Sequence, residues 1–489
     1  MNTLTQKTFT AVVWNFSGTF GTQAIQFLTT LILARLLSPA EFGLVGMLMA
    51  FTLIASSLVD GGFGAALIQQ SVTHLDESAV FYFNMLIAVC LYAAFWWLAI
   101  PIAGFYQQPE LVSITRALSL IFPFNALGLV QSSLFTKHLN FRAQTHALML
   151  ATFISGIIGV TMAVRHYGVW SLVGQSVSNA LLRSVFLWAF SAWRPLRRFH
   201  LTSLRAMFPY GARLLVSGLL GTMFDNIYPI IIGKFFAQSE VGFYSRAQLT
   251  QRQAADSLTS VVANVSFPAY AALQHDPQAL RAGYRQSIRY TSVVLFPLML
   301  GLAAMATPLF LLLFSAKWAP SIPYFQVLCL SGMLYHLHAL NLGVMKATGR
   351  ADLYLRVSVI KLVIAVAGLL IACRFGMPGI VWGQVAISWI GLTINTLYTG
   401  TIIAYSLRDQ LVDTLPYAAI SAASAGIVYL VSLQLAHLAH LLQIGVLLPL
   451  LLVLYLGLAR LFGLYAPFEL LARVRAHCIR RPAGEVAAV

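Results

Sequence analysis

The stretch LARLLSPAEFGLVGM, residues 33–47, is the most informative part of the chain because its pattern occurs a second time. The later copy is IGKFFAQSEVGFYS, residues 232–245. In both copies an apolar segment carries a basic residue near its end, a short polar turn follows, and a Glu-x-Gly step opens a new apolar run. The paired positions, Arg35 with Lys234, Glu41 with Glu240 and Gly43 with Gly242, share an offset of 199 residues.

A second pair of segments supports an internal duplication. RHYGVWSLVGQ, residues 165–175, resembles CRFGMPGIVWGQ, residues 373–384, and the shared Arg, Gly and Gln positions have an offset of 209. The repeat contains six predicted helices, an even number, so both copies enter the membrane in the same sense. This arrangement predicts two like-oriented lobes related by a pseudo-two-fold axis along the membrane normal, a known transporter architecture with its substrate site between the lobes.

The composition is that of a membrane protein. Of 489 residues, 59% are hydrophobic and 9% are charged, whereas soluble domains carry about 25% charged residues. The apolar runs are long enough to cross a hydrocarbon core about 30 Å thick. The four cysteines form no CxxC or evenly spaced set, which indicates neither a disulfide framework nor a metal site. The N-terminus has no cleavage site and is expected to be a retained first span.

We therefore predict an all-α polytopic membrane protein with about 14 transmembrane helices. The expected spans are 9–36, 41–68, 78–104, 111–136, 142–165, 168–192, 203–233, 240–271, 283–314, 321–347, 351–374, 377–405, 411–435 and 440–463. The predicted domains are an N-lobe (1–192), a linker (193–205), a C-lobe (206–405), two further helices (406–463) and a basic tail (464–489).

The net charge of +16 follows the membrane topology. Lys and Arg gather in alternate short connections, with a dense cluster in WRPLRRFHLTSLR, residues 193–205. This positive-inside pattern places both termini in the cytoplasm of a bacterial inner membrane and accounts for the charge without nucleic acid as a partner.

Charges inside the predicted spans are the candidates for function. A charge at the bilayer centre costs about 2.5–3.5 kcal/mol on insertion scales, so each should face a partner or a wet cavity. The interior charges are Asp60, Arg183, Arg213, Asp225, Arg246, Arg252, Asp256 and Lys361. Bases outnumber acids, which predicts a net positive cavity for an anionic ligand, and guanidinium forks match phosphate geometry.

One predicted helix carries a polar stripe. Tyr244, Gln248, Arg252 and Asp256 recur every four residues and therefore share one face. The stripe lines a cavity or packs on another polar helix, and two alternatives are structural ion pairs of Asp256 with Arg252 or Arg213. The sequence HLH at 336–338 suggests packing or hydrogen bonding more than a metal or proton relay. No catalytic set of residues occurs, so we expect no enzyme and no cofactor.

The segments ILARLLSPAEFGLVGMLMAF (32–51) and VDGGFGAALIQ (59–69) resemble the N-terminal signature of Wzx-type polysaccharide flippases. The similarity is to the exopolysaccharide, colanic-acid-like branch of the multidrug/oligosaccharidyl-lipid/polysaccharide exporter superfamily. It implies export of undecaprenyl-pyrophosphate-linked oligosaccharide repeat units across the inner membrane by alternating access, without ATP hydrolysis.

The resemblance also implies site residues. In related flippases the first, second, seventh and eighth spans flank a central cleft whose cations hold the pyrophosphate, and Arg213, Arg246 and Arg252 match such positions. This chain departs from the pattern because its first span offers only Asn15, Gln23 and Gln26, and its second carries Asp60. The cationic residues therefore fall in the second lobe together with Arg183, which argues against a symmetrical anion clamp.

Several functions remain open from sequence. A multidrug antiporter would need an acid-rich cavity, a lipid II flippase would differ only in the sugar carried, and an integral-membrane glycosyltransferase or polymerase would need acids near a membrane face. Coupling to H⁺ or Na⁺ would involve Asp60, Asp225 or Asp256. Substrate contacts are expected from Arg213, Arg252, Arg246, Arg183, Lys361, Gln248 and Tyr244. The expected partners are the lipid-linked oligosaccharide, membrane lipids and a polysaccharide polymerase or export machinery.

Overall fold

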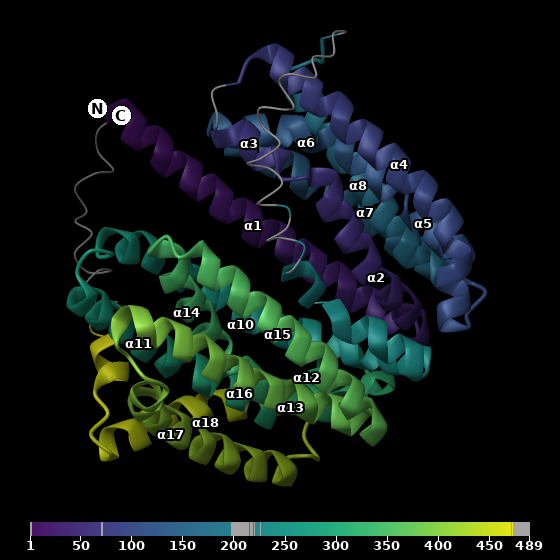
Figure 1. Ribbon diagram of the computed structural model, residues 1–489. Helices are drawn as coiled ribbons and strands as arrows, with labels where there is room; N and C mark the ends of the chain where they lie inside the picture. The colour runs from purple at the N-terminus through teal and green to yellow at the C-terminus, as the bar shows by residue number, and fades with distance from the viewer. Residues whose placement is uncertain are drawn as a thin grey trace, which may run out of the picture. The chain divides into compact units, whose positions relative to one another are not determined.

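The computed structural model describes residues 2–69, 72–196, 215, 219, 221–224, 226–470 and 472, with the side chains of 2–13, 15 and 351 left out. Within these ranges all regular structure is helical. The chain divides into two compact units, Met1–Ser245 and Arg246–Val489, with the boundary inside one helix (Figure 1). The predicted lobe boundaries and the symmetry axis remain predictions.

The described helices of the first unit begin with a long one and continue in hairpins. They are α1 (Asn2–Leu36), α2 (Pro39–Asp60), α3 (Phe63–Gln69), α4 (His74–Tyr106), α5 (Leu111–Leu118), α6 (Ile121–Lys137), α7 (Phe141–Val164) and α8 (Trp170–Phe190). Residues 226–235 are also helical, and α10 (Gln238–Ala272) begins in this unit.

The second unit holds the rest of α10 and the helices that follow it. These are α11 (Pro277–Ala304), α12 (Ala306–Phe314), η1 (Ala316–Trp318), α13 (Ser321–Gly332), α14 (Tyr335–Ala347), α15 (Ala351–Ala372), η2 (Cys373–Phe375), α16 (Gly376–Ile403), α17 (Leu407–Gln434) and α18 (His440–Leu461).

The predicted spans coincide with these helices wherever the structure describes them, and most of the range 203–233 lies outside it. Some spans are broken in two. The range 41–68 is interrupted at Gly61 and Gly62, whose φ angles of 55° and 72° are left-handed and end α2. Of the described helical segments, nine are long and apolar enough to cross a membrane.

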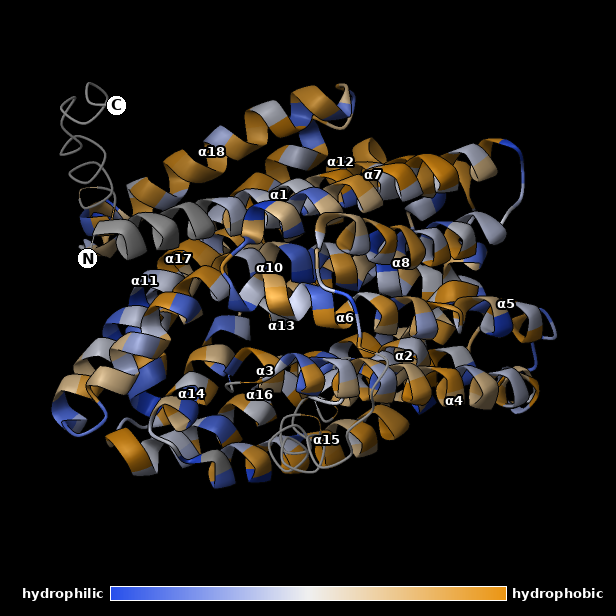
Figure 2. Cartoon of the chain, turned by 90° about the horizontal axis from the view of Figure 1, so that it is seen from above, coloured by the Kyte–Doolittle hydropathy of each residue, from blue (hydrophilic) through white to orange (hydrophobic). Residues whose placement is uncertain are grey.

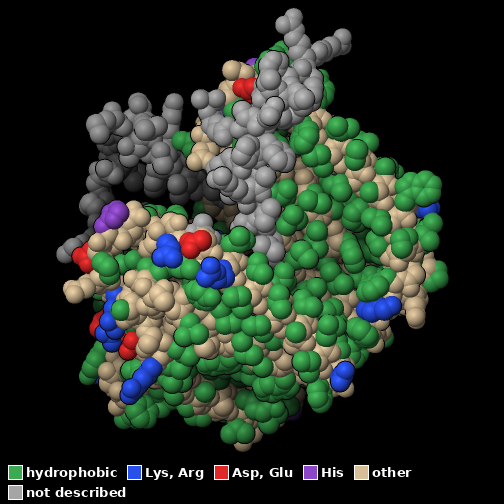
Figure 3. Space-filling model, in the orientation of Figure 1, with side chains coloured by type: hydrophobic (Ala, Val, Ile, Leu, Met, Phe, Trp, Pro, Cys, Tyr) green, Lys and Arg blue, Asp and Glu red, His purple; other side chains and the backbone are tan. Residues whose placement is uncertain are grey.

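Apolar side chains cover the outer surface of each unit. Figure 2 shows hydrophobic colour along most helices and hydrophilic colour at several connecting turns, and Figure 3 shows hydrophobic side chains over most of the described surface on that face. Trp97 and Leu461 are 75% and 76% exposed. In water such a surface would be an aggregation hazard, whereas in lipid it costs nothing.

The first copy of the repeated pattern builds a helix start. Ser38 is the N-cap of α2, and its hydroxyl accepts from the Glu41 backbone N–H at 3.4 Å. The Glu41 carboxylate accepts in return from the Ser38 backbone N–H at 2.6 Å. This capping box, with Pro39 at the first helical position, satisfies amide groups that would otherwise lack partners.

The two glycines of the repeated pattern face each other within the first unit. A Cβ placed on Gly43 would lie 1.7 Å from the Gln238 backbone oxygen, and one on Gly242 would lie 2.0 Å from the Pro39 backbone oxygen. The starts of α2 and α10 therefore cross with their backbones in direct contact, and the contact is reciprocal. This reciprocity agrees with the predicted duplication, in which each copy of the pattern supplies the glycine that admits the other copy's carbonyl.

The second repeated pattern also has a packing role. A Cβ on Gly174 of α8 would lie 2.5 Å from the Met162 sulfur of α7, and one on Gly383 of α16 would lie 3.0 Å from Cβ of Ala372 on α15. In each unit the repeated glycine brings the two helices of a hairpin together.

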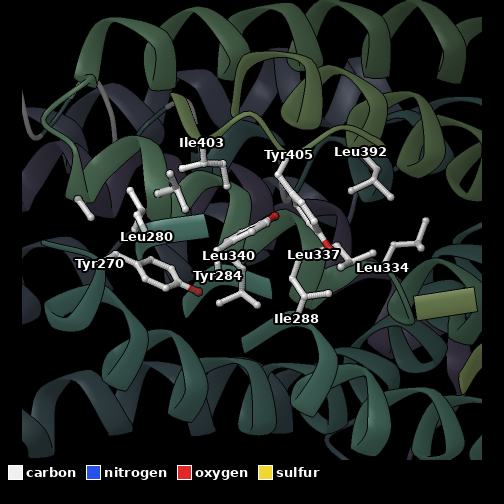
Figure 4. Packing of buried hydrophobic residues seen from close by; sticks show 12 residues of the cluster. Tyr270, Leu280, Tyr284, Ile288, Leu334, Leu337, Leu340, Leu392, Ile403 and Tyr405 are labelled. Carbon is white, nitrogen blue, oxygen red and sulfur yellow. The ribbon is translucent and has the colours of Figure 1, made fainter. Parts of the chain in front are cut away.

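A tyrosine-rich core holds the second unit (Figure 4). Tyr284 is fully buried, and its ring centre lies 6.2 Å from that of Tyr270 and 5.7 Å from that of Tyr405. At one side of this cluster the Tyr405 hydroxyl hydrogen-bonds Asp413, whose carboxylate also accepts two bonds of 2.6 Å from Arg285. The bidentate pair ties α11 to α17.

The glycine contact predicts a large effect of one methyl group. Gly43→Ala and Gly242→Ala each force a Cβ into backbone atoms that cannot rotate away, and we expect a loss of about 1–3 kcal/mol of stability. Gly104→Ala is the control, since a Cβ there meets nothing within 4 Å, and alanine is the better helix former. Thermal unfolding of the purified proteins in detergent should rank both contact variants below wild type and the control at or above it. Equal unfolding temperatures for all three variants would contradict the contact.

Candidate functional site

A polar cavity of about 260 Å³ lies inside the first unit, between α2, α6 and α8. Seven of its ten lining residues are polar, although the surrounding helices are apolar. The lining residues are Ser56, Val59, Asp60, Asn125, Gly128, Leu129, Ser132, Ser133, Arg183 and Ser184. The cavity thus gathers one carboxylate, one guanidinium, one amide and four hydroxyl groups.

The carboxylate of the cavity comes from the end of α2. Asp60 is the last residue of that helix, directly before the left-handed turn at Gly61. A Cβ on Gly64 would lie 2.8 Å from the Asp60 carboxylate and 3.2 Å from the Ser133 hydroxyl. The glycine of α3 therefore leaves room for the carboxylate beside α6.

The cation of the cavity is Arg183, in the middle of α8. The neighbouring Ser184 hydroxyl donates to the Phe124 backbone oxygen, and one turn later the Trp188 indole donates to the Leu127 oxygen at 2.8 Å. Gly128 lets α6 approach closely, because a Cβ there would lie 2.8 Å from the Ser184 hydroxyl. These contacts fix α8 against α6 and hold Arg183 at the cavity wall.

The two charges of the cavity are not joined to each other. No ion pair links Asp60 and Arg183 in the part of the chain that the structure describes, although both line the same space. Both residues keep solvent-accessible surface, although protein atoms surround the Arg183 guanidinium closely. A charged group within an apolar helix bundle needs water or a polar ligand, so we expect the cavity to contain water.

The predicted polar stripe of α10 is largely covered. Tyr244 is fully buried and its ring stacks on Tyr228 with centres 6.0 Å apart. Gln248 is 6% exposed, whereas Arg252 and Asp256 are half-buried.

Arg246 lies among aromatic rings. Its guanidinium carbon is 5.1 Å from the ring centres of both Phe314 and Trp318, and the residue is 6% exposed. A double cation–π contact of this kind holds a guanidinium inside protein and ties α10 to the end of α12 and to η1.

Lys361 and the two histidines of HLH lie in the second unit. His338 hydrogen-bonds Asn395 at 3.0 Å and Ser388 at 3.1 Å, and His336 hydrogen-bonds Ser292 at 2.7 Å. This agrees with the packing interpretation of these histidines. Among the described residues no group of His, Cys, Asp and Glu could hold a metal ion.

The side chains of Lys361 and His338 both lie close to Gly391 of α16. A Cβ on Gly391 would lie 3.3 Å from Cε of Lys361 and 3.5 Å from Cε1 of His338. Arg213 and Asp225, which the sequence also indicated, fall outside the residues that the structure describes.

Sequence reasoning missed the α6 wall of the cavity. Asn125, Gly128, Leu129, Ser132 and Ser133 follow the i, i+3, i+4 spacing of one helix face. This pattern of small and polar residues in an apolar span was visible in the sequence. It contains no charged residue, and the site prediction was based mainly on charged residues such as Asp60 and Arg183.

Comparisons with known proteins identify the family. Residues 32–323 match the model of the polysaccharide biosynthesis protein family. The succinoglycan biosynthesis transport protein ExoT of Rhizobium meliloti (strain 1021) is 31% identical over 67% of this chain and 67% of its own. The lipopolysaccharide biosynthesis protein WzxC of Escherichia coli (strain K12) is 23% identical over 82% of this chain and 81% of its own.

Solved structures show the same fold. The lipid II flippase MurJ, in an inward closed conformation, superposes with a TM-score of 0.74 at 14% identity, covering 94% of this chain and 100% of that one. An inward-facing multidrug resistance transporter of the MATE family gives a TM-score of 0.60 at 14% identity, covering 78% and 96%. The chain therefore belongs to the polysaccharide biosynthesis protein family, as a Wzx-type membrane transporter with the fold of the multidrug/oligosaccharidyl-lipid/polysaccharide exporter superfamily.

Proposed function

We propose that this transporter moves undecaprenyl-pyrophosphate-linked oligosaccharide repeat units from the cytoplasmic to the periplasmic leaflet, for exopolysaccharide or O-antigen synthesis. Family membership and the similarity to a succinoglycan transport protein and a lipopolysaccharide biosynthesis protein support a role in polysaccharide transport. The single observation that carries the proposal is the polar cavity with Asp60 and Arg183 inside an apolar helix bundle.

The cavity answers the physical problem of flipping. An oligosaccharide head group cannot cross hydrocarbon unaided, because every hydroxyl without a hydrogen-bond partner costs several kcal/mol. The prenyl tail is apolar and is soluble in the hydrocarbon core. A polar cavity replaces the water around part of the head group while the tail stays in the lipid. Alternating access then opens this space first to one side of the membrane and then to the other.

The pyrophosphate needs cations. Arg252, half-buried on α10, is our principal described candidate, and Arg213 is proposed with it. Gln248 and Lys361 are proposed as further polar contacts. Arg246 and Tyr244 have aromatic neighbours that hold them in place, so we assign them a supporting position beside the phosphate-binding residues.

The rival functions are less well supported. A multidrug antiporter for cations would need a net negative cavity, and here Arg183 offsets Asp60. A lipid II flippase shares the fold and differs in the sugar carried. A glycosyltransferase or polymerase does not fit the family, because its members and structural neighbours are transporters.

Energy for transport can come from the membrane potential. Moving negative charge outward from an inside-negative cell releases about 2.3 kcal/mol per charge per 100 mV. We propose that Asp60, Asp225 or Asp256 binds H⁺ or Na⁺ when the empty carrier resets, and that no other cofactor takes part. We also propose that both termini lie in the cytoplasm and that a polymerase or export complex receives the product.

Neutralising the cavity cation tests the proposal. Arg183→Gln should lower the initial rate of flipping of the host's lipid-linked oligosaccharide in proteoliposomes by about 10- to 100-fold, since hydrogen bonds to a charged group contribute about 1.5–3 kcal/mol. Arg356→Gln removes the same charge from an exposed site on α15 and should keep the wild-type rate. Equal rates for both variants would reject a role for the cavity.

Water access to the cavity can be measured separately. In a background without the four native cysteines, Ser132→Cys should react with a water-soluble maleimide, because Ser132 lines the cavity. Ser424→Cys is the control, since Ser424 is fully buried on α17. We expect Ser132→Cys to be labelled at least about tenfold faster than Ser424→Cys, and a tenfold ratio of rates corresponds to about 1.4 kcal/mol. Labelling of neither cysteine in folded protein would show that the cavity is closed to water.

A further inference from the structure

We infer that the cavity in the first unit is a subsite for one sugar ring of the head group, and that it does not hold the pyrophosphate. The inference rests on the proposed function and divides the substrate between two places. It follows from which hydrogen-bonding groups the cavity offers and from what a ligand must supply in return.

The two charged residues make opposite demands on a ligand. Arg183 has five N–H donors and no acceptor, whereas the Asp60 carboxylate only accepts. No ion pair joins these residues in the described structure. The Gly64 backbone N–H meets only part of the hydrogen-bonding capacity of the Asp60 carboxylate, so both side chains can take further partners from a ligand or from water. A sugar hydroxyl donates one hydrogen bond and accepts others, so a single ring can serve both residues. An ionised pyrophosphate only accepts and offers Asp60 no donor.

Charge points to the same ligand. The carboxylate of Asp60 offsets Arg183, so the cavity as a whole has no positive charge to hold a dianion or trianion. A phosphate bound beside Arg183 would share a space of about 260 Å³ with a carboxylate of the same sign, and such a like-charge contact is unfavourable. A neutral ring meets no such repulsion.

The hydroxyl groups of the wall are already oriented. The Ser184 hydroxyl donates to the Phe124 oxygen and therefore faces a ligand as an acceptor. The Ser132 hydroxyl accepts from the Gln144 amide at 3.0 Å, which leaves its proton for a ligand oxygen. The wall thus offers donors and acceptors side by side, as a ring with neighbouring hydroxyls requires, while Val59 and Leu129 can contact the C–H groups of the ring.

The size of the cavity sets a limit. Pockets that hold drug-sized ligands measure roughly 300–1,000 Å³, and this cavity is smaller. It can take one ring of a repeat unit. We propose that the remaining sugars and the pyrophosphate lie outside it.

A protection experiment distinguishes sugar from phosphate. The full-length protein, with Ser132→Cys as its one cysteine, is placed in nanodiscs and alkylated with N-ethylmaleimide. The probes are the host's repeat-unit oligosaccharide, freed from its lipid by mild acid, and inorganic pyrophosphate at the same concentration. We expect the oligosaccharide to slow alkylation and pyrophosphate to leave the rate unchanged. Ser113→Cys, exposed on α5 and outside the cavity lining, should be unaffected by either probe.

Asp60→Asn distinguishes a sugar subsite from a phosphate site, because it should weaken the binding of a sugar and strengthen the binding of a phosphate. The substitution replaces an acceptor of sugar hydroxyls with an amide and removes a negative charge. For a sugar subsite, the concentration of oligosaccharide that protects Ser132→Cys should rise about tenfold, equivalent to about 1.4 kcal/mol. For a phosphate site, pyrophosphate would begin to protect. The comparison of probes on the Asp60-containing protein does not depend on how well this variant folds.

Three outcomes overturn the inference: protection by pyrophosphate as strong as by oligosaccharide, no protection by oligosaccharide, or stronger pyrophosphate protection in Asp60→Asn. Flipping of the complete lipid-linked substrate is measured in proteoliposomes on the wild-type protein, which keeps the Ser132 hydroxyl. Flipping without protection by oligosaccharide rejects the sugar subsite alone, whereas absence of flipping rejects the proposed function.

Discussion

The free-energy cost of placing a charge inside hydrocarbon shapes this transporter. A charged side chain at the bilayer centre costs about 2.5–3.5 kcal/mol on insertion scales, and Asp60 and Arg183 both lie within predicted spans. The first unit meets this cost with a lined cavity. The α2 helix ends at Gly61, Gly64 leaves room for the carboxylate, and α6 turns its small polar face toward both charges. A protein that only needed to fold would be more stable with apolar residues there, so the charges indicate a polar ligand.

Much of the fold could be predicted because membrane helices obey simple rules. Length and hydropathy located the spans, since each must cover a fixed thickness of hydrocarbon. The repeated Glu-x-Gly pattern is short, but its residues have two separate structural roles. Glu41 completes a capping box, and Gly43 and Gly242 admit each other's neighbouring backbone. Both roles are local to a helix start, and therefore two copies of the pattern preserve them.

The remaining features depend on contacts between helices and left no periodic signal. The break of α11 and α12 at Met305 was not predicted. Arg246 was expected at the pyrophosphate because it is a base in an apolar span. No sequence pattern indicated that Phe314 and Trp318 would flank it. The emphasis on cations in the second lobe also left the cavity around Arg183 unforeseen, since its hydroxyl wall carries no charge. Roles for Arg252 and Arg213 at the phosphate remain predictions.

Transport by the proposed route requires that the head group enter the cavity of the first unit. An electron cryomicroscopy map of the protein in nanodiscs, with the host's own lipid-linked oligosaccharide bound, tests this most directly. We predict density for one sugar ring within hydrogen-bonding distance of both Asp60 and Arg183, with the pyrophosphate outside that space. A map in which Arg183 closes onto Asp60 as an ion pair, while the sugars bind elsewhere, would contradict the account.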